Sequence, residues 1–368
     1  QPGRIGQMST KGFEEEVIQV APAPPTEEEL RELRKKERRF QKEKPRRFQL
    51  DQRNYGGRDE SKWFVEIPQG EMTLLGAPGG TGKSWMFLYW AHGISKRSNP
   101  DTGKHWRVML WLGEDAAPIT YERLCALDAG YTNLEEPPEN VEFIWEQGRP
   151  LYRAERFTMD QVDAKGERRR ITASDVKPTE GMTYLEKRIA AFKPDILFLD
   201  PLSVLGPIGF ETDNEVCAKF VSDMRDRFRK FDGLTVLASH HSNKAGRDGD
   251  SAASLRGSSA LTDGFRHAFT LRLIGQLEDK SEVLFLRTVK ANYVAPVNTF
   301  YKRVFDKGTT TIEPMDRKQV DEVFDRKELK KEIGEDVGVA LKGQNETTGG
   351  TEKNKPATTK APTNPFEG

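Results

Sequence analysis

The stretch Gly76-Ala-Pro-Gly-Gly-Thr-Gly-Lys-Ser84 decides the fold. It follows a short apolar run, Glu71-Met-Thr-Leu-Leu-Gly76, and precedes an apolar helical pattern that starts at Trp85. Counted strictly, the first glycine position of a phosphate-binding loop falls on Ala77, so we treat the loop as a tolerated variant of that motif. A strand, a glycine-rich loop and a helix in this order predict a nucleotide site.

Each part of this loop is suited to holding a polyphosphate. Its glycines let the backbone curl so that successive N–H groups point at the phosphates, and the start of the next helix adds its positive end. We expect Lys83 to reach the β- and γ-phosphates and the Ser84 hydroxyl to ligate Mg²⁺. The expected cofactors are therefore Mg²⁺ and a triphosphate, assumed to be ATP. The predicted nucleotide-binding residues are Ala77, Pro78, Gly79, Gly80, Thr81, Gly82, Lys83, Ser84 and Trp85.

Three more apolar runs follow, beginning at Arg107, Asp195 and Leu234. Near-continuous apolar runs are typical of parallel strands that are buried on both faces. A helix is predicted near 212–230, because four apolar residues recur there at four-residue spacing: Val216, Phe220, Met224 and Phe228. From about 267 to 314 the pattern becomes strand after strand. The sequence therefore predicts an α/β fold whose mostly parallel, twisted sheet has an antiparallel C-terminal extension.

Acidic residues stand at the ends of two of these strands. Asp200 closes the run Asp195-Ile-Leu-Phe-Leu-Asp200, where a carboxylate holds the water shell of Mg²⁺; Asp195 opens it and is expected to be structural. Glu114 follows the strand that begins at Arg107. If that strand lies beside the loop strand, Glu114 faces the γ-phosphate and polarises the attacking water. Asp115 competes for this role but fits better as the N-cap of the next helix.

The fourth strand ends in Ser239-His240-His241. A polar group at this position can contact the γ-phosphate and respond to its loss. We assign this role to His241 and expect His240 to pack.

Composition limits the classes of function. Of the 368 residues, 35% are apolar and 32% are charged, which indicates a globular centre between solvated ends. The formal net charge is zero, so nucleic-acid binding must come from local patches. No apolar window of 18 residues and no signal pattern is present, which predicts a soluble, cytoplasmic protein without membrane contact. The histidines and cysteines show no zinc spacing.

The predicted domain organisation has four parts. Residues 1–25 are predicted to be disordered, and 26–60 form a basic helical arm and linker that is either solvated or in contact with DNA or a neighbouring subunit. The ATPase domain is predicted at 61–330, with a long insertion or mobile loop at 150–182. Residues 331–368 are rich in Thr, Lys, Pro and Gly and are predicted to be disordered.

The chain resembles the RepA-type plasmid replicative helicases, which are hexameric motors with a RecA fold. Five blocks in order, spanning about residues 70–315, carry the resemblance. The loop alone is generic, and the Arg-Gly-Ser-Ser and Lys-Ala-Asn-Tyr blocks are far more specific. The blocks are Gly76-Ala-Pro-Gly-Gly-Thr-Gly-Lys-Ser; Gly113-Glu-Asp-Ala-Ala with Tyr121-Glu-Arg-Leu; Leu199-Asp-Pro-Leu; His240-His-Ser-Asn-Lys with Arg256-Gly-Ser-Ser-Ala-Leu-Thr-Asp-Gly-Phe-Arg266; and Val289-Lys-Ala-Asn-Tyr-Val-Ala-Pro.

The resemblance implies catalytic roles. Glu114 matches the family's catalytic glutamate and His241 its sensor histidine. Arg266 matches an arginine finger that reaches a neighbour's γ-phosphate; without the family, a surface salt bridge is the expectation for it. Lys290 stands where related helicases carry a trans-acting lysine, but the arginine they place two residues later is Asn292 here. Either Arg266 supplies the finger instead, or the trans site is weaker.

The resemblance also implies a DNA contact. The Gly-, Ser- and Ala-rich segment from Asn243 to Ser259 resembles a central-pore loop, in which Lys244 and Arg247 hold phosphates of single-stranded DNA. A plain surface loop is the alternative. Arg256 is also predicted to bind DNA, although a structural place or one near the nucleotide fits it too.

We therefore expect an ATP-dependent, ring-forming helicase or translocase acting on single-stranded DNA in replication, in a bacterial, plasmid or phage context. The expected partners are DNA, further copies of the chain in a hexameric ring, and a primase or loader. The first alternative is a RecA-like recombinase or mediator, and the second is a nucleotide-gated regulatory ATPase.

Overall fold

The computed structural model describes residues 47–50, 65–100, 102–128, 138–162, 168–242, 259–293, 295–325 and 329. They all belong to one compact unit, Pro45–Gly368. The segments 1–25 and 331–368, the basic arm predicted over 26–60 apart from residues 47–50, and the DNA-contact candidates Lys244, Arg247 and Arg256 lie outside the described residues.

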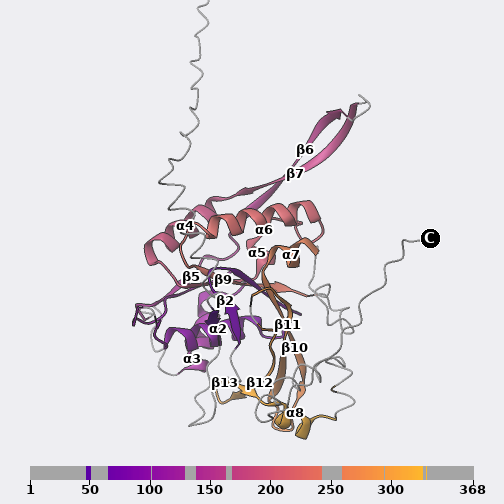
Figure 1. Ribbon diagram of the computed structural model, residues 1–368. Helices are drawn as coiled ribbons and strands as arrows, with labels where there is room; N and C mark the ends of the chain where they lie inside the picture. The colour runs from indigo at the N-terminus through magenta and orange to yellow at the C-terminus, as the bar shows by residue number, and fades with distance from the viewer. Residues whose placement is uncertain are drawn as a thin grey trace, which may run out of the picture. The chain divides into compact units, whose positions relative to one another are not determined.

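A nine-stranded sheet forms the centre of the described structure (Figure 1). The strands, in their order across the sheet, are β13 (Thr309–Met315), β12 (Asn298–Asp306), β11 (Glu282–Ala291), β10 (His267–Gln276), β3 (Met72–Ala77), β9 (Thr235–His241), β8 (Ile196–Asp200), β4 (Val108–Leu112) and β5 (Val141–Ile144).

The strands from β10 to β5 pair in parallel, and those from β10 to β13 pair antiparallel. The α/β architecture with an antiparallel extension is therefore confirmed. The four apolar runs became β3, β4, β8 and β9, because side chains on both faces of these strands are buried.

Helices cover both faces of the sheet. The helices are α2 (Lys83–Ser95), α3 (Ala117–Leu127), α4 (Glu180–Phe192), α5 (Leu202–Leu205), α6 (Asn214–Phe228), α7 (Ser259–Gly264) and α8 (Arg317–Val323).

Alternate residues of each strand point to opposite faces, so the core divides in two. One hydrophobic cluster joins Trp111 and Leu199 to α4, α5, α6 and α7, and the other joins Leu110 and Phe198 to α2 and α3. The four apolar residues that predicted α6 are all buried in the first cluster. The sheet is thus packed between two helical layers. The candidate site residues lie at the ends of its strands.

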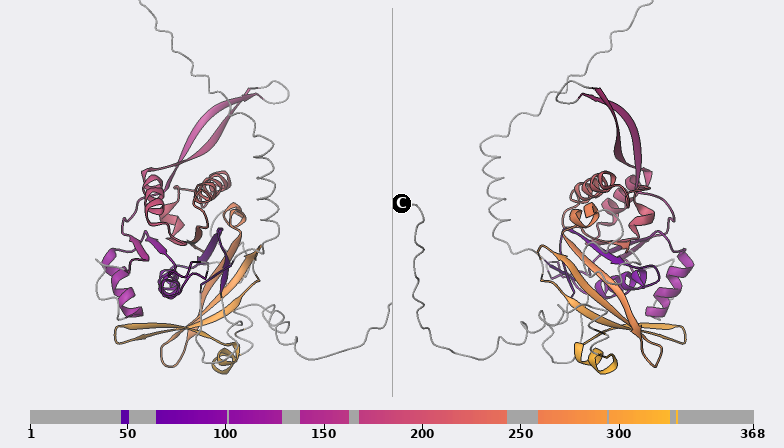
Figure 2. Two further views of the ribbon diagram at one scale, coloured as in Figure 1. Left: turned by 60° about the vertical axis from the view of Figure 1, so that its left-hand side comes forward. Right: turned by 90° about the vertical axis from the view of Figure 1, so that its right-hand side faces the viewer.

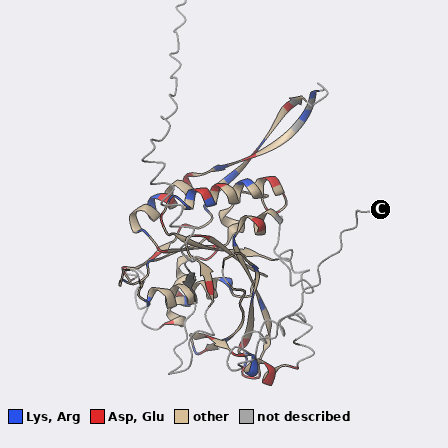
Figure 3. Cartoon of the chain, viewed as in Figure 1, with Lys and Arg blue, Asp and Glu red and all other residues tan. Residues whose placement is uncertain are grey.

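Within segment 150–182, most of the described residues form a two-stranded antiparallel ribbon rather than an irregular loop. β6 (Tyr152–Val162) and β7 (Arg168–Pro178) pair along their whole length and extend away from the rest of the described structure (Figures 1 and 2). Both signs of charge are spread along the ribbon (Figure 3). On one face Phe157 and Met159 leave 47% and 46% of their surface exposed. Pairing between β6 and β7 satisfies backbone N–H and C=O groups that would hydrogen-bond to water in an irregular loop.

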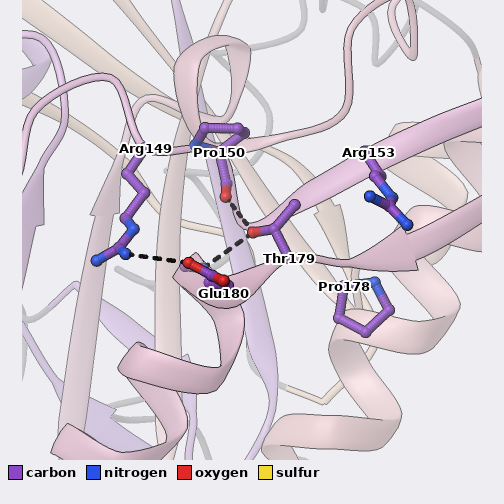
Figure 4. A pocket seen from close by; sticks show the side chains of 7 residues that line it. Arg149, Pro150, Arg153, Pro178, Thr179 and Glu180 are labelled. Atoms are coloured by element: carbon purple, nitrogen blue, oxygen red, sulfur yellow. Dashed lines mark hydrogen bonds and ion pairs between the residues drawn. The ribbon is translucent and has the colours of Figure 1, made fainter.

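The root of the ribbon is fixed to the core (Figure 4). The Thr179 hydroxyl donates a 2.5 Å hydrogen bond to the carbonyl of Pro150 and accepts one from the amide of Gly181, which caps α4. Arg149 lies 3.7 Å from the carboxylate of Glu180. Tyr152 is buried and packs edge-to-face on Phe220 of α6. The ribbon is therefore an insertion with a well-packed base.

A second small sheet pairs β1 (Arg47–Gln49) with β2 (Glu66–Pro68) in antiparallel register. Among the described residues, no helix is long and apolar enough to cross a membrane.

Candidate functional site

The glycine-rich loop leads from β3 directly into α2. Gly80 and Gly82 have φ angles of 80° and 106°, a region that favours glycine because it has no Cβ. Gly82 is the N-cap of α2, and no side chain caps this helix. The ammonium group of Lys83 turns back over the loop and donates to the carbonyl of Ala77 at 3.3 Å. The local structure therefore has the curl, the helix start and the cation that the motif predicts.

Asp200 lies at the end of β8, next to the first turn of α2. Its Oδ2 accepts a 2.5 Å hydrogen bond from the Ser84 hydroxyl, and its Oδ1 accepts one from the hydroxyl of Ser239 on β9. The side chain is almost fully buried. Burial raises the pKa of this carboxyl, while the two hydroxyls and Lys83 oppose the rise. Asp200 thus joins the first turn of α2, through Ser84, to β9, through Ser239, although the three residues are far apart in sequence.

The oxygens of Ser84 and Asp200 form a donor set that suits Mg²⁺. Magnesium prefers hard oxygen ligands and is often held by one or two protein groups together with substrate phosphates. A buried carboxylate raised in pKa by desolvation is stabilised by a cation placed beside it. The residues present therefore fit the ion that the motif implies.

Glu114, His241 and Lys83 form a chain of polar contacts at the same edge of the sheet. His241 Nε2 lies 3.3 Å from Glu114 Oε1, and His241 Nδ1 lies 3.2 Å from Lys83 Nζ. The contact with His241 is the main cause that lowers the pKa of Glu114, opposed by desolvation and supported by the charge of Lys83. Burial lowers the pKa of Lys83, while Asp200 and Glu114 oppose the fall. The Glu114 carboxylate is thus linked through His241 to the ammonium group at the glycine-rich loop.

The other strand-end histidine lies elsewhere. His240 is fully buried, with Nε2 3.5 Å from Glu211 and its ring against Phe210. The structure thus places His241 in the site and His240 in the core.

The condition set for Glu114 is not met, and Asp115 does not have the capping role expected of it. β4 does not lie beside β3, because β9 and β8 stand between them. Glu114 still reaches the site, since the carboxyl ends of parallel strands share one edge and His241 bridges the gap. Asp115 does not cap α3: the N-cap is Ala116, and Asp115 instead forms an ion pair with Arg123. Asp195, at the opposite end of β8, accepts a 2.7 Å hydrogen bond from the amide of Arg107, in keeping with a structural role.

Arg266 and Lys290 lie together at the opposite edge of the sheet from the loop. The amide of Arg266 donates to the carbonyl of Met72, at the start of β3. At about 3.3 Å per residue, the five steps from Met72 to Ala77 separate this edge from the loop by roughly 16 Å. Lys290 donates to the carbonyls of Thr262 and Asp263 at 2.9 and 3.1 Å. Neither residue is placed to reach the phosphate loop of its own chain.

The environment of this pair also bears on its role. Within the described ranges Arg266 has no ion-pair partner, and its Nε is buried without a hydrogen bond. The surface salt bridge expected for an isolated arginine is therefore not formed there. Burial is the main cause that lowers the pKa of Lys290, and the charge of Arg266 adds to it while Asp263 opposes it.

One arginine beside the loop was missed by sequence reasoning. Arg303, on β12, is 4% exposed and lies against Gly82. Next to it, Phe305 packs edge-to-face on Trp85 with ring centroids 5.9 Å apart. The available signal was strand alternation, because Tyr301, Arg303 and Phe305 share one face and the first of them is buried.

The fold and the loop define the class. A strand order with β3 between β9 and β10, a glycine loop entering α2, and a buried aspartate closing β8 make a P-loop NTPase with a RecA-like fold. The model of the AAA domain family matches residues 41–247, more than half of the chain, so the protein belongs to this family of P-loop ATPases. No curated protein matches the chain. The matched region contains the loop, Glu114, Asp200 and His241 and ends before Arg266.

Proposed function

We propose that this chain is an ATP-dependent helicase or translocase of the RepA type, which assembles into a ring and moves on single-stranded DNA in replication. The observation that supports this proposal best is the placement of polar groups at two opposite edges of one sheet. The phosphate loop, Asp200 and Glu114 occupy one edge, and Arg266 and Lys290 the other. Copies arranged head to tail would bring the two edges together.

In the proposed reaction, the loop amides and Lys83 hold the β- and γ-phosphates of ATP. When bound, Mg²⁺ neutralises charge on the phosphate oxygens, and Ser84 and Asp200 are the residues that would hold it. Glu114 accepts a proton from a water molecule as the water oxygen bonds to the γ-phosphorus. The bond to the β–γ bridging oxygen breaks, and ADP and inorganic phosphate are the products.

His241 has a connecting role in this proposal. It contacts both the base, Glu114, and the phosphate cation, Lys83. Loss of the γ-phosphate would remove negative charge next to Lys83. Because Lys83 contacts His241, the last residue of β9, the change in charge would reach the end of that strand. The segment carrying Lys244 and Arg247 follows β9 directly in sequence, so the proposed DNA contact is linked to the state of the nucleotide.

Arg266 completes the site in trans in this proposal. A guanidinium from a neighbouring copy would stabilise the charge that develops on the γ-phosphate. Hydrolysis would then depend on assembly, and a primase or loader would determine where the ring is placed on DNA.

Two measurements test the proposal. Particles imaged with a non-hydrolysable ATP analogue and single-stranded DNA should be closed rings, and ATPase turnover should rise when single-stranded DNA is added. Lys83→Ala should abolish turnover under both conditions. Filaments would instead support a recombinase, and separate particles whose turnover ignores DNA would support a regulatory ATPase.

A further inference from the structure

Arg303 is a buried cation that comes to the phosphate loop from the antiparallel extension. It lies on β12, directly opposite Glu282 of β11, and only 4% of its surface is exposed. Its Nε donates a 2.8 Å hydrogen bond to Glu282 Oε2, and Nη2 donates to the same oxygen. Both hydrogen bonds thus go to a single carboxylate oxygen of Glu282, and together they fix the orientation of the guanidinium.

The remaining nitrogen of Arg303 points at the loop. A Cβ at Gly82 would overlap Nη1, so the guanidinium packs against the glycine that precedes Lys83. Nη1 is buried and has no hydrogen-bond partner among the described residues. A buried donor without a partner is destabilising, and so is a buried charge that is only partly paired. A separate benefit is needed to explain why an arginine occupies this place.

The surroundings limit what this benefit is. Arg303 packs over the ring of Phe305 at 5.1 Å, and Phe305 in turn packs on Trp85 in the first turn of α2. The loop is thus supported from β12 through one guanidinium and two rings. In a low-dielectric interior a positive charge acts strongly on nearby anions. The guanidinium of Arg303 lies against Gly82, the residue just before the phosphate-binding Lys83.

We propose that Arg303 is a positioning residue for the phosphate loop: it fixes Gly82 by contact and adds a positive potential that favours each further phosphate of the nucleotide. This inference rests on the proposed nucleotide hydrolysis at the same loop. It assigns to the antiparallel extension, which the family match does not cover, a part in discriminating triphosphate from monophosphate. Glu282 moderates the effect because it neutralises part of the charge.

The test separates charge from shape. Arg303→Gln keeps a donor for Glu282 but removes the charge, Arg303→Lys keeps the charge, and Lys302→Met is a matched control on the same strand, where Lys302 pairs with Asp279 at 2.8 Å. Dissociation constants for ATP, ADP and AMP are measured by calorimetry with Mg²⁺. Arg303→Gln should weaken ATP binding on the order of tenfold, ADP less, and AMP by about twofold or less. Arg303→Lys should recover most of the ATP affinity, and Lys302→Met should change none of the three.

A purely structural role predicts a different pattern, in which all three nucleotides lose affinity by the same factor. That pattern, or unchanged affinities in Arg303→Gln, overturns the inference while ATP binding by the wild type leaves the proposed function standing. If Arg303→Gln does not fold by circular dichroism, Glu282→Gln replaces it: relieving the neutralisation should tighten ATP relative to AMP, and an unchanged ratio overturns the inference. A wild-type protein that binds no triphosphate overturns both proposals.

Discussion

The hydroxyl of Ser84 and the carboxylate of Asp200 are joined by a 2.5 Å hydrogen bond across 116 residues of sequence. This contact connects the first turn of α2 to the end of β8 and sets the place where Mg²⁺ is expected. Burial raises the pKa of the Asp200 carboxyl, so a cation placed beside it would stabilise the charged form.

Asp200→Asn should therefore weaken Mg²⁺ activation without unfolding the protein. The amide keeps the size of the side chain and removes a charge that burial disfavours, so the melting temperature should change little. We expect the Mg²⁺ concentration for half-maximal ATPase activity to rise roughly 10- to 100-fold or more. Asp195→Asn, at the opposite end of β8, is the matched control, and an equal shift in that variant would contradict the assignment.

His241→Ala should move the acidic limb of the pH–rate profile. The contact with His241 holds the pKa of Glu114 below its usual range, so Glu114 stays deprotonated as the pH falls. Without the histidine its pKa returns upward, and the activity that depends on the carboxylate is lost at a higher pH than in the wild type. The profile of kcat/KM against pH measures this shift. Exchange of the exposed His105 for Ala should leave the limb in place, and an unmoved limb in His241→Ala would refute the link.

Mixing two inactive subunits tests the trans role of Arg266. Glu114→Gln removes the proposed base, a loss of about 10²- to 10⁴-fold for a general base, while Arg266→Ala leaves Glu114 in place and removes the proposed finger. If each site is built from two copies, mixed assemblies contain some sites with a base from one subunit and a finger from the other. Turnover should therefore rise above that of either variant alone. Rates that simply add over the mixing ratio would show that Arg266 acts within its own chain or not at all.

His267 should make stability depend on pH in the mildly acidic range. Burial lowers its pKa to about 4, and neither ring nitrogen has a hydrogen-bond partner among the described residues. The unfolded state therefore binds more protons between about pH 4 and the usual value near 6.5, so stability falls as the pH decreases through this window. A shift of this size corresponds to a loss on the order of 3 kcal/mol. His267→Phe should flatten the pH dependence of the urea midpoint, and an unchanged slope would refute it.

The parts of the fold that could be predicted from sequence are those with local signals. The runs that became β3 and β8 are apolar on both faces, and the residue types from Ala77 to Ser84 form a motif within eight positions. Lys83, Ser84 and Asp200 were found for this reason. Residue spacing also predicted that Glu114 stands at the end of a strand.

Relationships set by strand order could not be predicted in the same way. The apolar run of β4 does not encode that β8 and β9 separate it from β3, because the long crossover connections decide this. Arg303 was missed because its contact with Gly82 depends on how far β12 extends past the loop edge. For segment 150–182 the sequence left a long insertion or a mobile loop open, because its strands are polar and pairing between β6 and β7, rather than burial, keeps them extended.

The root of the ribbon has a consequence for engineering. The amide of Thr179 donates to the carbonyl of Leu151 at 2.9 Å, and Tyr152 stands opposite Pro178, so the two legs are already bridged where they leave the core. Just outward from that bridge the ribbon still contacts the core, because Lys219 of α6 donates to the carbonyl of Ser174 and Ala154 and Val176 pack against the core cluster. Among the described residues, the separate appendage is the part outward from the Phe157–Ala173 pair. Trimming it to a tight turn shortens the molecule without cutting any connection among the strands that carry the nucleotide chemistry, and a tag or sensor domain grafted there inherits a stiff stalk.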